Sequence, residues 1–224
     1  MPFGPFGSSR GRASDDRLDT IEETIRRMLD DDRIVFDLAM SILLDGVDWQ
    51  GVRREIKATD QRVNEGEREV RRQLVIHASV AGAIDTPAIL VYMSIVKDIE
   101  RIGDYGKNLR DLGRDGADLS EFPEWHQLRD RVAALITETA EIFAARDNER
   151  ATQRLIEGDK LLDRFDDMVS ELVRADDGQP HATARALAAR YLKRIVAHLT
   201  NVLSAVVMPV DRLDYFDEDP EDRD

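Results

Sequence analysis

The sequence predicts an all-α protein built as two tandem three-helix bundles related by internal duplication. Three observations favour this fold class. Apolar residues recur at helical spacing almost everywhere between the two chain ends, and no segment shows the sustained alternation typical of a strand. Clusters of turn residues divide the chain into six long segments. The last three segments repeat motifs of the first three about 100 residues later, which is the period of a duplicated unit rather than of a short-repeat solenoid.

The first three segments form the predicted bundle of residues 16–116. Between Leu18 and Ile42, apolar residues recur at spacings of three, four or seven. From Val52 to His77 the spacings alternate between four and three, which is typical of a helix that packs against neighbouring helices. Thr86 is predicted to cap the third helix because a proline follows it at the first helical position. Gly113 and Gly116 are expected to end that helix.

The second bundle is predicted to span residues 117–216. Apolar residues follow the helical period from Leu128 to Ile142 and again from Leu155 to Leu172. A turn cluster at residues 176–180 then precedes a sixth helix that runs to about Met208.

Composition excludes several classes of function. The chain carries 46 acidic and 32 basic residues, a formal net charge of −14, which argues against a nucleic-acid surface and against docking on an anionic membrane. It has no cysteine, so disulfides, thiolate metal sites and cysteine nucleophiles are excluded. The longest apolar stretch, residues 88–96, is too short to span a bilayer, and a cytoplasmic location is expected. Residues 1–15 are expected to form a flexible tail and residues 217–224 an acidic tail.

Four acidic residues suggest a cation site in the first bundle. Glu100 and Asp104 are four positions apart, so they share one edge of the third helix beside its apolar stripe. Asp60 and Glu67 occupy the corresponding edge of the second helix. If the two helices pack antiparallel, the edges meet, and a hard cation such as Mg²⁺, Ca²⁺, Mn²⁺ or iron would relieve the repulsion between the carboxylates.

A second interpretation of the same residues needs no metal. The four carboxylates would then be solvated edge residues that pair with Arg101 or Lys107. Gly103 and Gly106, which lie inside the third helix, would serve the close approach of a neighbouring helix. His77 continues the apolar stripe of the second helix and is expected to be a buried residue rather than a ligand.

The second bundle lacks the acidic pair. Lys193 and Ala197 stand at the positions that correspond to Glu100 and Asp104, whereas Asp166 remains on the fifth helix. A salt bridge from Lys193 is therefore expected to replace an ion there. We expect at most one metal site, in the first half.

The segment Asp98 to Asn108 resembles the L-E-R-I-G-D-x-A-x-N signature of PhoU-type phosphate-uptake regulators. The resemblance covers residues 16–216, including the halfway duplication. It implies a cytoplasmic, non-enzymatic regulator of phosphate homeostasis that is often a homodimer. The implied partners are the high-affinity phosphate ABC transporter and the phosphate-sensing histidine kinase, whose output such regulators restrain.

The resemblance also implies a metal ion or cluster, of iron, manganese, zinc, magnesium or calcium, on the acidic face. The matching residues are Asp60, Glu67, Glu100 and Asp104. The second signature departs from the family pattern at residues 193–197. This departure leaves two other functions open, namely an accessory of a secondary phosphate permease and a metalloenzyme of the carboxylate-bundle type. The metalloenzyme is the weaker alternative because the Glu-x-x-His ligands of that class are absent from the sequence.

Overall fold

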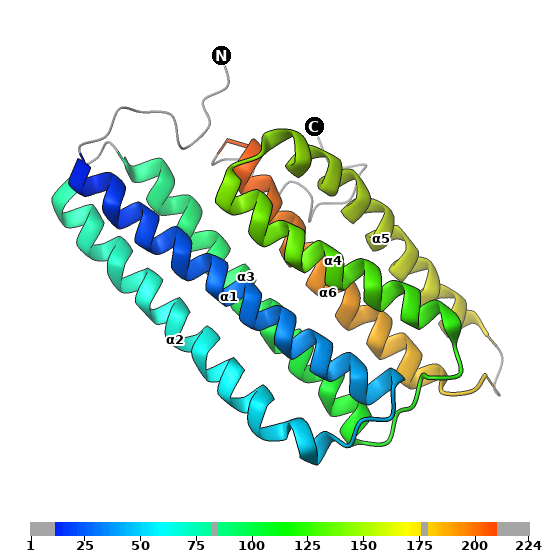
Figure 1. The fold of residues 1–224 in the computed structure, drawn as a ribbon. Coiled ribbons are helices and arrows are strands. Elements are labelled where there is room, and N and C mark those ends of the chain that lie inside the picture. Colours follow the sequence, from blue (N-terminus) through cyan, green and yellow to red (C-terminus); the bar gives the residue numbers. More distant parts are fainter. Residues whose placement is uncertain (1–11, 82–84, 176–178, 210–224) are drawn as a thin grey trace.

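A computed structural model of the chain describes residues 12–81, 85–175 and 179–209. Within those ranges all regular structure is helical, which confirms the predicted fold class. The six helices lie side by side along one common direction (Figure 1). Their bounds are α1 (Arg12–Leu44), α2 (Trp49–Ala81), α3 (Thr86–Arg114), α4 (Pro123–Ala145), α5 (Asn148–Arg174) and α6 (Ala182–Val207). Among the described residues, no helix is both long enough and apolar enough to cross a bilayer.

The helix ends differ from the predicted ones in three places. α1 begins at Arg12, inside the segment expected to be a tail, while residues 1–11 and the acidic tail lie outside the described residues. The predicted cap of α3 at Thr86 is wrong, because Asp85 holds the cap position and Thr86 is already helical. Asp85 is buried, and its carboxylate lies 2.9 Å from the imidazole of the equally buried His77. Gly113 lies within α3 rather than after its end, whereas Gly116, with a φ of 96°, directly follows the C-cap residue Asp115.

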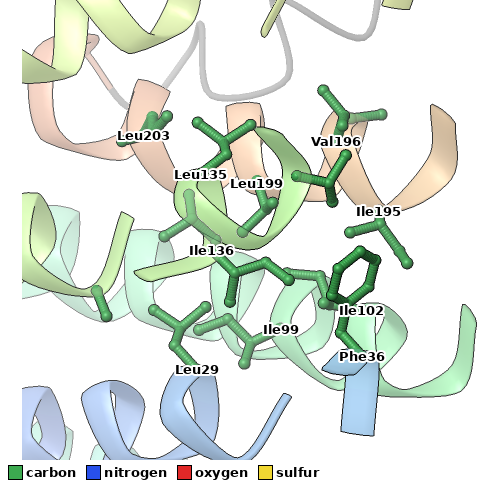
Figure 2. Close-up of a cluster of buried hydrophobic side chains, with 14 of the residues drawn as sticks. Leu29, Phe36, Ile99, Ile102, Leu135, Ile136, Ile195, Val196, Leu199 and Leu203 are labelled. Carbon is green, nitrogen blue, oxygen red and sulfur yellow. The ribbon is translucent and has the colours of Figure 1, made fainter. Parts of the chain in front are cut away.

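The two sets of three helices share one continuous core. α1, α2 and α3 pack against one another, as do α4, α5 and α6, while α3 also lies against α6 and α1 against α4. Figure 2 shows side chains from four helices meeting where the sets join, among them Leu29 and Ile99 from the first set and Ile136 and Leu199 from the second. The division into bundles of residues 16–116 and 117–216 therefore stays a prediction, because the core runs across it.

A buried polar cluster ties α3 to α6 across this junction. His198 Nδ1 lies 2.8 Å from Asp98 Oδ1, and Asn201 Nδ2 donates to the same oxygen at 3.2 Å. The imidazole of His198 also stacks on Tyr105, with ring centroids 5.8 Å apart. Since a buried carboxylate without these donors would be costly, the cluster fixes which residues of α3 and α6 face each other.

We predict that Gly158→Ala destabilises the fold. A Cβ atom at this position of α5 would overlap the Cγ2 methyl of Thr200 on α6, so the two helices would have to separate. Overpacking of this kind typically costs about 1–3 kcal/mol. Gly51→Ala is the matched control, because a Cβ atom there meets no atom within 4 Å and alanine is the better helix former. Chemical unfolding of both variants measures the difference, and equal free energies of unfolding would contradict the packing argument.

Candidate functional site

The acidic edges of α2 and α3 meet, as the sequence predicts for antiparallel neighbours. Lys107 Nζ lies 2.7 Å from Asp60 Oδ1 and 2.7 Å from Asp104 Oδ1, so it joins the two helices at one level. About two helical turns away, Lys97 Nζ lies 2.5 Å from Glu100 Oε2 and 3.8 Å from Glu67 Oε1. We call the four carboxylates Asp60, Glu67, Glu100 and Asp104 the acidic face.

The acidic face is arranged as two pairs, each bridged by a lysine. The pairing of Lys107 with Asp60 and Asp104 is the contact expected in the interpretation without a metal. Within the ranges that the structure describes, no three histidine, aspartate or glutamate side chains are grouped so that they could hold one metal ion. The cation site therefore stays a prediction.

Electrostatics hold Lys107 in its charged form. Its partial burial alone would lower the pKa of the ammonium group. Hydrogen bonds to Asp104 and Asp60, together with their negative charge, outweigh that effect and raise the pKa above its ordinary value. The ammonium group thus acts as an internal cation at the point where α2 and α3 meet.

Behind the acidic face lies a fifth carboxylate, Asp32 of α1, which sequence reasoning missed. Its side chain is 1% exposed, and neither of its oxygens has a hydrogen-bond partner. Asp32 lies in the apolar stripe of α1, four residues after Met28 and three before Val35. The seven-residue gap between those apolar residues was the available signal, because an acidic residue fills the position where the period demands an apolar one.

Gly103 of α3 makes room for this carboxylate. A Cβ atom at position 103 would lie 2.7 Å from Asp32 Oδ1 and 4.0 Å from Val63 Cγ1 of α2. The three helices of the first half therefore converge on Gly103, which lies between Glu100 and Asp104 in the chain. The close approach predicted for Gly103 is confirmed, but its neighbour is a carboxylate rather than an apolar side chain.

Burial raises the pKa of Asp32 well above its ordinary value of 3.8. The negative charges of Asp31, Glu100, Asp60 and Asp104 raise it further, in that order. The charges of three of the four residues of the acidic face thus act on the pKa of Asp32, although it belongs to a different helix.

The second half has the predicted salt bridge in place of an acidic pair. Lys193 Nζ of α6 lies 2.5 Å from Asp166 Oδ2 of α5. Asp166 corresponds to Glu67, and Lys193 corresponds to Glu100. In this half one lysine thus replaces an acid of the face, whereas in the first half the lysines are added to a complete set of four.

We predict that Asp32 makes stability fall as the pH rises. Because its pKa is raised in the folded state, the folded chain binds more protons than the unfolded chain above the unfolded value of 3.8. The wild type therefore loses stability across that window, and Asp32→Asn does not suffer this loss. Thermal unfolding at several pH values should show an advantage of Asp32→Asn that grows from about pH 4 toward neutrality. Parallel pH curves for the two chains would contradict the burial of an unpaired carboxylate.

We predict that Gly103 and Asp32 are energetically coupled. In the wild type, the methyl group of Gly103→Ala presses on Asp32 Oδ1 and destabilises the fold. In an Asp32→Ala background the same change meets no carboxylate, so the helix preference for alanine, about 1 kcal/mol, should make it neutral or stabilising. A double-mutant cycle from urea unfolding should give a coupling energy of about 0.5–3 kcal/mol. The same effect of Gly103→Ala in both backgrounds would refute the contact.

Comparison with known proteins supports the resemblance seen in the sequence. Residues 25–111, which include the whole acidic face and Asp32, match the family model of the PhoU domain. Among solved structures, the chain is similar to the crystal structure of PhoU from Pseudomonas aeruginosa, with 22% sequence identity and a TM-score of 0.71. That similarity covers 86% of this chain and 96% of the other. The comparison with curated proteins gave no match.

The two findings address different parts of the chain. The family model matches residues 25–111, the segment that carries the acidic face, and the structural similarity shows that the fold extends through the second half as well. Residues 25–111 thus match the PhoU domain, and the fold of the chain is similar to that of PhoU from Pseudomonas aeruginosa along most of its length.

Proposed function

We propose that the chain regulates phosphate uptake and phosphate-starvation signalling as a cytoplasmic, non-enzymatic adaptor. Its partners in this proposal are the phosphate ABC transporter and the phosphate-sensing histidine kinase, whose output it restrains when phosphate is plentiful. The observation that carries the proposal is the acidic face, because the residues of the family signature on α3 and their counterparts on α2 lie together on one surface. Long amphipathic helices also offer extended faces to partner helices.

We further propose that the acidic face binds a metal ion or cluster of iron, manganese, zinc, magnesium or calcium through Asp60, Glu67, Glu100 and Asp104. The donor set is made of carboxylate oxygens, which suit hard cations. Each lysine contact uses one oxygen of each carboxylate that it joins. A bound cation would supply positive charge between α2 and α3 and cross-link them more rigidly than the flexible lysines do.

The chain is also proposed to be a homodimer, a state that light scattering on the purified protein measures. Exposed apolar side chains support self-association. Val75 and Val80 on α2 are 62% and 70% exposed, and Val173 on α5 is 75% exposed. The proposal involves neither nucleic acid nor insertion into a membrane, in keeping with the net charge of −14.

One observation favours a second candidate function, an accessory of a secondary phosphate permease. The salt bridge between Lys193 and Asp166 gives the second half a different surface from the first. A regulator of the same fold whose second half has a different surface could bind a different transporter.

Deletion of the gene tests the main proposal. A reporter of phosphate-starvation genes should be derepressed in phosphate-rich medium, because the kinase would no longer be restrained. Complementation with the wild type should restore repression. Complementation with a chain carrying Asp60→Asn, Glu67→Gln, Glu100→Gln and Asp104→Asn should not, provided that the variant accumulates to the same level. An unchanged reporter together with altered permease-dependent phosphate uptake would favour the accessory function instead.

A further inference from the structure

We propose that two copies of the chain associate through an uncharged apolar surface where α2 ends and α3 begins. This inference rests on the homodimer proposed above and names its interface. The last two turns of α2 and the first two turns of α3 lie at the end of the first half where α1 begins (Figure 1). We call their exposed large apolar side chains the apolar tip: Val75, Ile76 and Val80 of α2 with Leu90 and Met93 of α3.

The gathering of exposed apolar residues is the first argument. The apolar tip holds five of the ten large apolar side chains that are exposed in the described part of the chain. The other five are spread over α1, the turn after it, α5 and α6. Single exposed apolar residues are normal on a protein surface, whereas a group of them marks a place of interaction. The two helix ends therefore form a surface that a partner covers.

The lack of surface charge is the second argument. Charged residues make up 35% of the chain. In the described turns from Gln73 to Ala81 and from Asp85 to Val96, however, only His77 and Asp85 can carry a charge near neutral pH. Both are 1% exposed, and the imidazole lies 2.9 Å from the carboxylate, so each is paired with the other below the surface. These turns of α2 and α3 consequently expose no charged side chain.

The charge of the whole chain favours a second copy as the partner. With a net charge of −14, two chains repel each other wherever their charged surfaces meet. The apolar tip avoids this repulsion, and an uncharged apolar surface is complementary to itself, as a two-fold interface requires. A bilayer is the less suitable partner, because helices that lie on membranes carry lysine or arginine beside their apolar face. The described turns that carry the apolar tip have neither.

The apolar tip continues the edges on which the acidic face lies. On α3, Met93 lies seven residues before Glu100, which places both on the same edge of the helix. On α2, Val75 follows Glu67 and Arg71 at spacings of four. A dimer formed through the apolar tip therefore has one acidic face on each side of its two-fold axis. A partner with two equivalent docking segments would bind both faces at once, which increases its overall affinity.

Sedimentation velocity of the full-length chain over a dilution series tests the inference. The wild type should form a dimer. Val80→Glu and, separately, Leu90→Glu should raise the dissociation constant of the dimer at least tenfold, because each buries two unpaired carboxylates in a two-fold interface. Val173→Glu is the matched control, since Val173 is as exposed as Val80 and α5 ends at the opposite end of the molecule (Figure 1). It should dimerise like the wild type, and unchanged melting temperatures show that all three variants fold.

Spin labels give a second measurement that does not disturb the interface with charge. The chain has no cysteine, so Val80→Cys or Val173→Cys introduces a single site for a label. The distance between the two labels of a dimer, measured by double electron–electron resonance, should be shorter for position 80 than for position 173. The opposite order would place the interface elsewhere and overturn the inference.

The outcomes separate the apolar tip from the homodimer on which the inference rests. If Val80→Glu and Leu90→Glu dimerise like the wild type, the homodimer stands and the apolar tip is not its interface. If the wild type is a monomer throughout the dilution series, both the homodimer and its interface are overturned. A monomeric wild type that binds phosphatidylcholine vesicles, and loses this binding in Val80→Glu, would instead assign the apolar tip to a lipid surface.

Discussion

The close approach of α1 to α3 is the constraint on which the first half depends. Three glycines of α3 face α1, and a Cβ atom at each would collide with a different residue of that helix: Gly103 with Asp32, Gly106 with Val35 and Gly113 with Ile42. Because helix formation favours alanine over glycine by about 1 kcal/mol at each such position, this row is unfavourable for an isolated helix. Its compensation is tight packing, since α1 can lie deep against α3 and bury the apolar stripes of both helices.

Close approach of two helices at glycines also occurs in the second half, but between different helices. In the first half the glycines lie on α3, whereas in the second the close contact is between Gly158 of α5 and Thr200 of α6. The acidic edges also differ in composition between the two halves. In the second half Lys193 forms a salt bridge with Asp166, whereas both corresponding positions of the first half are acidic. A lysine that replaces one acid removes the excess charge of that edge, whereas a lysine added beside two acids does not. The first half consequently concentrates negative charge that the second half has neutralised.

Most of the fold could be predicted from the sequence, because six long segments with a clean helical period leave few alternatives. The meeting of Asp60 and Glu67 with α3 followed from the same periodicity once antiparallel packing was assumed. Two features could not be predicted. Asp98 and His198 are 100 residues apart, and only the packing of the halves brings them together. The apolar period of α1 ranks the position of Asp32 as inward, but periodicity cannot show that a charged side chain stays there without a partner.

The place of Asp32 in the core sets it apart from the residues of the acidic face. Asp60 and Asp104 lie at the rim, where their lysine contacts are partly solvated and worth little stability. Asp32 lies in the core between α1 and α3, so its ionisation acts on the contact that holds the first half together. α3 in turn packs against α6 through Asp98 and His198. A change in the charge of Asp32 would therefore bias helix packing in both halves, whereas a change in the charge of Asp60 or Asp104 would alter only the surface.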